Sequence, residues 1–248
     1  MSLGILFPGQ GSQSIGMLKD LKSSFKVVSE IFEEASDYLS CDLWKITKNG
    51  PESKINDTEF TQPIMLCSAF SVWKIWNDEG GEKPIFLAGH SFGEYTALCA
   101  SEAVKFKDAV KLVKKRAECM KSAPEGVMAA IIGIDYDDLK SVYDENKLTE
   151  VSIANINAPG QIVISGTNSG VKELSDLAML KKAKKIIPLP VSVASHSYLM
   201  QKQSEIFKEF IKNIKISEPL IPVINNVDVK NEKIEKNIKD ALVRQLYS

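Results

Sequence analysis

A glycine-flanked serine constrains the fold of this chain more than any other sequence feature. Residues 85–88 form a short apolar run, and Gly89-His90-Ser91-Phe92-Gly93 then follows the pattern G-x-S-x-G, before a stretch suited to a helix at 94–103. A buried strand, a sharp turn and a helix are the context in which this pattern holds a nucleophile. The glycines permit a tight turn around a strained serine, whose hydroxyl lies at the positive end of the next helix. We expect Ser91 to be a nucleophile; the alternative is a plain strand-to-helix turn.

The predicted elements divide the chain into two domains. Between 125 and 190 the apolar patterns give the order β-α-β-β-α-β, which is the ferredoxin-like arrangement. We therefore expect an α/β fold: a large α/β-hydrolase-like domain with a parallel sheet, from residues 1–124 and 191–248, and an inserted ferredoxin-like α+β subdomain at 125–190. Further expectations within the large domain are one helix at 18–39, an irregular segment at 41–59 and a helix that opens at 61 with Pro63 in its first turn.

Composition excludes several classes of function. The 248 residues carry a net charge of −1, which gives no argument for binding to nucleic acid or to a membrane surface. No apolar segment reaches the length of a membrane span, and we expect no leader sequence. The cysteines are scattered without a C-x-x-C pair, so we expect neither disulfides nor a metal site, and a cytoplasmic location. These cysteines are Cys41, Cys67, Cys99 and Cys119.

A nucleophilic serine needs a base within hydrogen-bond reach, and the chain has only two histidines. His90 is adjacent to Ser91, and a tight turn directs neighbouring side chains apart. His196 is therefore the candidate base, the alternative being a histidine that caps a helix. An oxyanion would need N–H donors, for which the backbone of Phe92 and the loop around Gln10 are the natural sources.

Arginine is rare in this chain. Of 31 basic residues, only Arg116 and Arg244 are arginines, so each invites the question of what a planar, bidentate cation does there. Arg116 lies near the apolar stripe of an amphipathic helix at 106–120. An arginine in such a place by default extends its head group to the surface. The sharper interpretation is an inward guanidinium aimed at a substrate anion.

Five motifs occur in an order that carries a resemblance over essentially the whole chain. The motifs are Phe7-Pro-Gly-Gln-Gly-Ser-Gln13, Gly89-His-Ser-Phe-Gly-Glu-Tyr95, Arg116 about one helix later, Ile153-Ala-Asn-Ile-Asn-Ala-Pro-Gly-Gln-Ile-Val-Ile-Ser-Gly166 and Val193-Ala-Ser-His196. Together they resemble the malonyl-CoA:acyl carrier protein transacylase family of bacterial fatty acid synthesis.

The resemblance implies a reaction. Ser91 takes malonyl from malonyl-CoA as an ester with His196 as base, and the phosphopantetheine thiol of acyl carrier protein then accepts it in a ping-pong scheme. The implied substrates are malonyl-CoA and holo acyl carrier protein, with no cofactor and no metal. Acyl carrier protein is the implied partner, and we expect a monomer that binds neither nucleic acid nor membrane.

The resemblance also implies roles for individual residues. Backbone N–H groups of Gln10 and Phe92 form the oxyanion hole, and Arg116 pairs bidentately with the malonyl carboxylate. A main-chain carbonyl near the end of the last helix orients the histidine, and the matching position is Gln245. Three further residues are expected to line the site: His90, Gln62 and Asn155.

The chain departs from the family pattern at three places. Relatives often carry Leu at the position of Phe92 and Pro at the position of Ala194. Relatives also continue past the Arg-Gln-Leu-Tyr segment with a further helix and a strand that contains Gly-Pro-Gly. We therefore expect a truncated C-terminal part of the catalytic domain, with part of the pocket wall missing.

Three alternative functions stay open at this point. One is the same chemistry with another acyl group, such as methylmalonyl. The second is a serine hydrolase that releases free malonate. The third is a protein that binds a carrier protein without catalysis, for which Ser91 would be dispensable.

Overall fold

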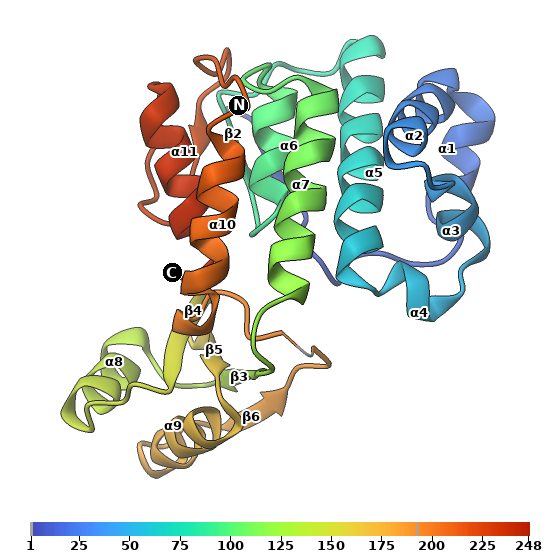
Figure 1. Ribbon diagram of the computed structural model, residues 1–248. Helices are drawn as coiled ribbons and strands as arrows, with labels where there is room; N and C mark the ends of the chain where they lie inside the picture. Colours follow the sequence, from blue (N-terminus) through green and yellow to red (C-terminus); the bar gives the residue numbers. More distant parts are fainter. Residues whose placement is uncertain (1, 192) are drawn as a thin grey trace. The chain divides into compact units, whose positions relative to one another are not determined.

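Two separate sheets organise the chain, one parallel and one antiparallel (Figure 1). The computed structural model describes residues 2–191 and 193–248. The chain divides into two compact units. Unit 1 comprises Met1–Glu118 and Lys208–Leu242, and unit 2 comprises Cys119–Phe207 and Val243–Ser248.

The fold is an α/β fold. Its elements in chain order are β1 (Gly4–Phe7), α1 (Lys19–Ser24), α2 (Lys26–Leu39), α3 (Leu43–Asn49), α4 (Glu52–Ile55), α5 (Thr58–Asp78), β2 (Phe86–Gly89), α6 (Gly93–Ala100), α7 (Phe106–Lys121), β3 (Val127–Ile132), α8 (Tyr136–Glu145), β4 (Val151–Ala158), β5 (Gln161–Gly166), α9 (Asn168–Leu180), β6 (Lys185–Pro188), a 3₁₀ turn (Tyr198–Met200), α10 (Gln201–Ile211), β7 (Val223–Ile224) and α11 (Glu235–Arg244).

The sheet of unit 1 is parallel, as expected, with the order β1-β2-β7. Phe7 is aligned with Gly89 and Ala88 with Ile224, so the carboxyl ends of all three strands lie at one edge. Helix α6 packs on these strands and is buried along its whole length. Loops that follow parallel strands meet at this edge, which is where open α/β sheets place their sites.

Two sequence expectations about unit 1 are wrong. The predicted single helix at 18–39 is two helices, because Phe25 takes an extended backbone between α1 and α2. The segment at 41–59 is helical rather than irregular. The side chain of Asp42 caps α3 by accepting from the Lys45 N–H at 2.8 Å, and Leu43 and Ile46 are buried against the unit. Tertiary burial thus overrides the polar local composition.

Helix α5 also begins earlier than its proline predicts. The side chain of Asp57 accepts a hydrogen bond from the Glu59 N–H at 3.0 Å and caps the helix there. Pro63 consequently lies in the second turn rather than the first. All residues from 61 to 68 are buried, and this packing keeps the helix continuous through a position that lacks an N–H donor.

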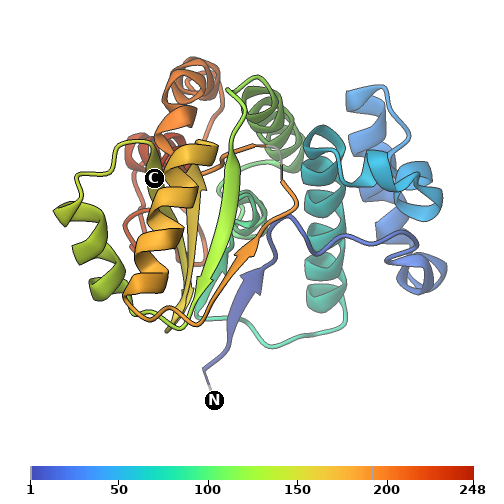
Figure 2. The same cartoon turned by 90° about the horizontal axis from the view of Figure 1, so that it is seen from below.

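Unit 2 contains an antiparallel sheet with the order β4-β5-β3-β6. Side chains alternate along β3, so Ala129 and Ile131 belong to one core cluster and Met128 and Ala130 to another. Figure 2 shows α8 and α9 together on one side of this sheet, and Leu139 and Leu174 from these helices belong to the first cluster.

The bounds of unit 2 differ from the predicted subdomain at 125–190. Residues flanking the predicted subdomain and the last six residues of the chain hydrogen-bond within unit 2. Gln203 Nε2 donates to the Ser122 carbonyl at 3.1 Å, and the His196 N–H donates to the Leu246 carbonyl at 3.0 Å. Such contacts join residues that are distant in the sequence, so the local apolar pattern does not indicate them. The division into 1–124 with 191–248 and 125–190 stays a prediction.

No helix in the described part of the chain has both the length and the apolar character needed to cross a bilayer.

Candidate active site

The turn that carries Ser91 is a strained backbone held between β2 and α6. Ser91 has φ 51°, in the left-handed region, which costs a non-glycine residue roughly 1–3 kcal/mol. The flanking glycines are required sterically. A Cβ on Gly89 would lie 2.0 Å from the Gly93 carbonyl carbon, and a Cβ on Gly93 would lie 2.6 Å from the Phe7 oxygen. The structure thus has the sharp strand-turn-helix that the sequence pattern predicts.

The loop of Gln10 lies beside this turn within unit 1. The His90 N–H donates to the Phe7 carbonyl at 3.0 Å, which joins the turn to the end of β1. A Cβ on Gly9 would lie 2.5 Å from Nδ1 of His90, so the imidazole rests against the loop. The Gln10 side chain is exposed and donates from Nε2 to Thr58 Oγ1 at 3.2 Å.

Arg116 points inward rather than to the surface. The residue is 1% exposed, and Nη2 donates to Ser91 Oγ at 2.9 Å. The guanidinium carbon lies 5.7 Å from the centre of the Tyr95 ring. Burial lowers the pKa of the Arg116 guanidinium from its ordinary value, while Tyr95 and Glu94 oppose that shift. Because arginine stays protonated in proteins, a fixed positive charge lies at the serine oxygen.

Two further predicted residues of unit 1 are buried. Phe92 is the N-cap residue of α6, directly before the helix begins, and it is buried in the core. Gln62 is fully buried on α5. Unit 1 therefore contains Ser91 and Arg116 in direct contact, with Gln10, His90, Phe92 and Gln62 on the elements around β1, β2 and α5.

His196 belongs to unit 2 and is held by the end of the chain. Nδ1 of its ring lies 2.6 Å from the Gln245 carbonyl oxygen. A carbonyl oxygen only accepts, so Nδ1 carries a hydrogen, and in the neutral imidazole Nε2 then carries the lone pair that a general base needs. His196 as a whole is 5% exposed. Asn155 also lies in unit 2, half-buried on β4 where the pairing with β5 is irregular.

Sequence reasoning missed two residues at the turn, Asn226 and Glu94. Asn226 Oδ1 accepts from the Ser91 N–H at 3.0 Å, and Glu94 is buried beside it. A signal was present in the sequence, because the pair Asn225-Asn226 directly follows the apolar residues Val223 and Ile224, which form β7. Side chains placed just after a parallel strand lie at the edge of the sheet where sites are built.

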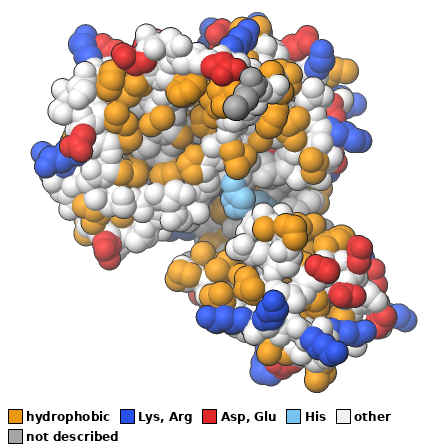
Figure 3. All heavy atoms as spheres, turned by 180° about the vertical axis from the view of Figure 1, so that it is seen from behind, with side chains coloured by type: hydrophobic (Ala, Val, Ile, Leu, Met, Phe, Trp, Pro, Cys, Tyr) orange, Lys and Arg blue, Asp and Glu red, His pale blue; other side chains and the backbone are white. Residues whose placement is uncertain are grey.

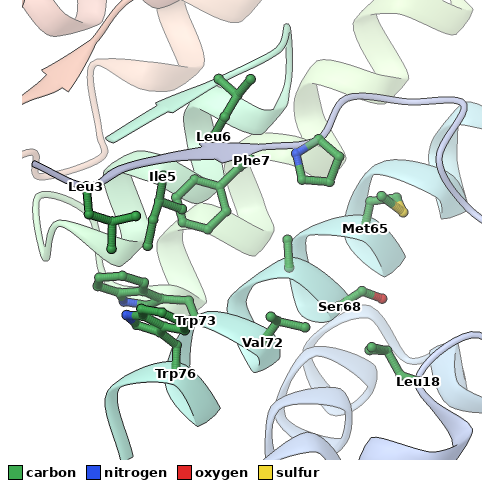
Figure 4. Close-up of a pocket in the computed structure, with 12 residues that line it drawn as sticks. Leu3, Ile5, Leu6, Phe7, Leu18, Met65, Ser68, Val72, Trp73 and Trp76 are labelled. Carbon is green, nitrogen blue, oxygen red and sulfur yellow. The ribbon is translucent and has the colours of Figure 1, made fainter. Parts of the chain in front are cut away.

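The apolar cavity of unit 1 does not belong to this site. It measures about 450 Å³ and lies between β1 and α5 (Figure 4). Figure 3 shows hydrophobic side chains gathered on one face of unit 1. None of the predicted site residues lines the cavity. Those that do line it include Leu3, Ile5, Leu6, Met65, Val72, Trp73 and Trp76.

Residues 5–244 match the acyl transferase domain family, and the chain is a member of that class of protein. The chain is 43% identical over 247 residues to the malonyl CoA-acyl carrier protein transacylase of Salmonella typhimurium, covering 98% of this chain and 80% of the relative. It is 45% identical over 255 residues to the enzyme of that name from Bacillus subtilis, covering 99% and 79%. The chain therefore belongs to the malonyl CoA-acyl carrier protein transacylase family.

Solved structures of similar proteins agree with this assignment. An acyl carrier protein S-malonyltransferase from Vibrio cholerae aligns with a TM-score of 0.96 and 43% identity over 100% of this chain and 82% of that one. A malonyl-transacylase solved in complex with a holo acyl carrier protein of a type II polyketide synthase aligns with a TM-score of 0.96 and 42% identity, with the same coverage.

Proposed function

We propose that this protein moves malonyl from malonyl-CoA to the phosphopantetheine thiol of acyl carrier protein, in fatty acid biosynthesis, through a malonyl ester of Ser91. The observation that carries this proposal is the 2.9 Å hydrogen bond from buried Arg116 to Ser91 Oγ. A cation fixed at the nucleophile suits an acyl group that itself carries a carboxylate. The charge-assisted pair with the carboxylate would select malonyl over uncharged acyl groups.

In the first half-reaction, Ser91 Oγ attacks the thioester carbonyl of malonyl-CoA while Nε2 of His196 takes the hydroxyl proton. The hydrogen bond from Nδ1 to the Gln245 carbonyl supports this role, because it favours the neutral tautomer with its lone pair on Nε2 and stabilises the imidazolium that forms. We propose the backbone N–H groups of Gln10 and Phe92 as donors to the oxyanion. Collapse of the tetrahedral intermediate releases coenzyme A, whose sulfur takes the proton from His196.

In the second half-reaction, the thiol of holo acyl carrier protein gives its proton to His196 and attacks the malonyl ester. Ser91 leaves and recovers a proton from the imidazolium, so the enzyme returns to its starting state. Every proton in this scheme passes through His196, and the scheme draws its protein groups from one chain, so we propose a monomer that uses no cofactor. His90, Gln62 and Asn155 are proposed to line the acyl site.

The finer description of the fold is part of the proposal. The order β4-β5-β3-β6 with antiparallel neighbours supports a ferredoxin-like subdomain. The parallel sheet of unit 1, with its serine in the turn after β2, supports an α/β-hydrolase-like catalytic domain.

The test is formation of the acyl-enzyme in the absence of carrier protein. Incubation with malonyl-CoA should add one malonyl group to the intact mass, map it to Ser91 and release coenzyme A. Addition of holo acyl carrier protein should then remove the label. Ser91→Ala should show neither event, whereas the carrier-binding alternative expects that variant to keep full function.

Two other results would redirect the assignment. Labelling by acetyl-CoA but not by malonyl-CoA would contradict the proposed substrate. Release of free malonate without carrier protein, at a rate near that of transfer, would identify a hydrolase.

A further inference from the structure

The turn that holds Ser91 is fixed by a side chain from a distant part of the sequence. Asn226 follows β7 and reaches both sides of the turn at once. Its Oδ1 accepts from the Ser91 N–H at 3.0 Å, and its Nδ2 donates to the Gly89 carbonyl at 2.8 Å. One amide thereby bonds to the end of β2, before the turn, and to the nucleophile itself.

Asn226 is in turn anchored to a buried carboxylate. Glu94 is 2% exposed, and its Oε2 accepts from the backbone N–H of Asn226 at 2.9 Å and also from Nδ2. A buried carboxylate is costly unless it is hydrogen-bonded, so Glu94 fixes both the backbone and the side chain of Asn226. Glu94 also lies in the first turn of α6, where the helix dipole favours a negative charge.

This arrangement needs an amide and no other polar group. The Ser91 N–H requires an acceptor, while the Gly89 carbonyl and the Glu94 carboxylate require a donor. Asparagine offers one of each on the same short side chain. Aspartate would set a second carboxylate against Glu94, and serine has one oxygen where two atoms are used.

We propose that Asn226, held by Glu94, is a positioning residue that keeps the Ser91 hydroxyl in its reactive orientation. The proposal rests on the proposed function, because it assumes that Ser91 carries the acyl group. A left-handed backbone at a non-glycine residue persists only where the surroundings determine it, and the Asn226 amide supplies that determination. Loss of the amide leaves the nucleophile present but no longer fixed.

The experiment compares acylation rates per active site in three variants. Asn226→Ala should lower the rate constant of Ser91 malonylation by about 10- to 100-fold, because a displacement of the order of 1 Å costs that much. The KM for malonyl-CoA should stay within about two-fold, since Arg116 can still pair with the malonyl carboxylate in this variant. Asn226→Asp should be slow as well, because two carboxylates then face each other.

The third variant exchanges the two partners. In the double variant Asn226→Asp/Glu94→Gln, the amide introduced at position 94 can donate to the carboxylate introduced at position 226, which still accepts from the Ser91 N–H. This pair should acylate at least about five-fold faster than Asn226→Asp alone, since the contact between positions 94 and 226 has a donor and an acceptor again, while the Gly89 carbonyl lacks the Asn226 donor in both variants. The acylation rate is expressed per active site, so it does not depend on how much of the protein is folded. If Asn226 only supported folding, the double variant would not recover this rate.

Asn225→Ala is the matched control. Asn225 lies in the same loop, and its side-chain oxygen accepts from the Asp228 N–H at 2.7 Å, so it supports the loop rather than the serine. Its replacement should lower the melting temperature without slowing acylation per active site. The inference is overturned if Asn226→Ala behaves like this control, or if the exchanged pair is no faster than Asn226→Asp. If the unsubstituted protein forms no malonyl ester at Ser91, the proposed function fails and this inference fails with it.

Discussion

Ser91 and His196 occupy two turns that share an unusual backbone but are stabilised in different ways. Neither residue is a glycine, yet both have positive φ, 51° for Ser91 and 58° for His196. In unit 1 the N–H of Ser91 donates to a side chain, that of Asn226, which Glu94 holds in place. In unit 2 the ring and the N–H of His196 donate to backbone carbonyls, those of Gln245 and Leu246.

The difference predicts which substitutions each turn tolerates. A contact made by a side chain is lost when that residue is changed, whereas a contact made by a carbonyl is present in any residue that keeps the same backbone. The nucleophile should therefore depend on the identity of Asn226. The base should depend on the path of the chain near 245 rather than on the residue found there.

Replacing Ser91 and His196 should give the largest effect, and it tests whether the two turns act in one reaction. Ser91→Ala and His196→Ala should each lower malonyl transfer by about 10⁴-fold or more, and the double variant should be no worse than either single one. Groups that act as a unit give such non-additive losses. Initial rates of transfer to holo acyl carrier protein measure the effect, and losses that multiply in the double variant would show that the turns act independently.

Arg116→Ala should give the next largest effect, and it should depend on the substrate. The lost charge-assisted hydrogen bond is worth about 1.5–3 kcal/mol, or roughly 10- to 150-fold in kcat/KM for malonyl-CoA. The value for acetyl-CoA should fall much less, because that substrate has no carboxylate. Equal losses for both thioesters would contradict the role of Arg116 and leave it as a contact that only supports Ser91.

The labelling rate of a buried thiol measures the local stability of the Ser91 turn without that of the His196 turn. Cys99 lies on α6, and burial raises the pKa of its thiol well above the ordinary 9.0. The thiol therefore stays protonated at neutral and mildly alkaline pH, and alkylation requires local opening of the helix. Asn226→Ala should speed iodoacetamide labelling of Cys99 by about ten-fold, because it removes contacts at the start of α6.

The control for this measurement is a change at the other turn. Gln245→Ala should leave the labelling rate of Cys99 unaltered, while half-exposed Cys41 should label quickly in every variant. Mass mapping of the alkylated peptides distinguishes the thiols. Equal acceleration by both substitutions would mean that the two turns share their stability.

Gln245→Ala should have the smallest effect on catalysis. Its backbone carbonyl still accepts from Nδ1 of His196, so kcat should fall by no more than about three-fold even if the melting temperature drops. A loss as large as that of Asn226→Ala would show that the Gln245 side chain itself orients the histidine, and the contrast between the two turns would then be wrong.

Much of this arrangement could be predicted from the sequence because it is local. The G-x-S-x-G pattern specifies the turn at Ser91 through the absence of a Cβ at Gly89 and Gly93. The amphipathic pattern of α7 and the scarcity of arginine single out Arg116, which the structure places against Ser91. The apolar segments between 125 and 190 predict the strands of unit 2 in their observed order.

The remainder depends on contacts between distant residues. Asn226 is 135 positions from Ser91, and an Asn-Asn pair after a strand is also typical of an ordinary turn. The sequence does not predict helices α3 and α4, because their stability comes from burial of a few side chains in a polar segment. The break at Phe25 has no glycine or proline to mark it.

The left-handed backbone of Ser91 also limits which amino acids can serve as the nucleophile. Threonine has the same hydroxyl chemistry, yet a β-branched side chain at φ 51° is strongly disfavoured. Cysteine is unbranched at Cβ and fits the same backbone. The backbone at this position therefore allows cysteine as a replacement nucleophile and disfavours threonine. The reason lies in conformation rather than in reactivity.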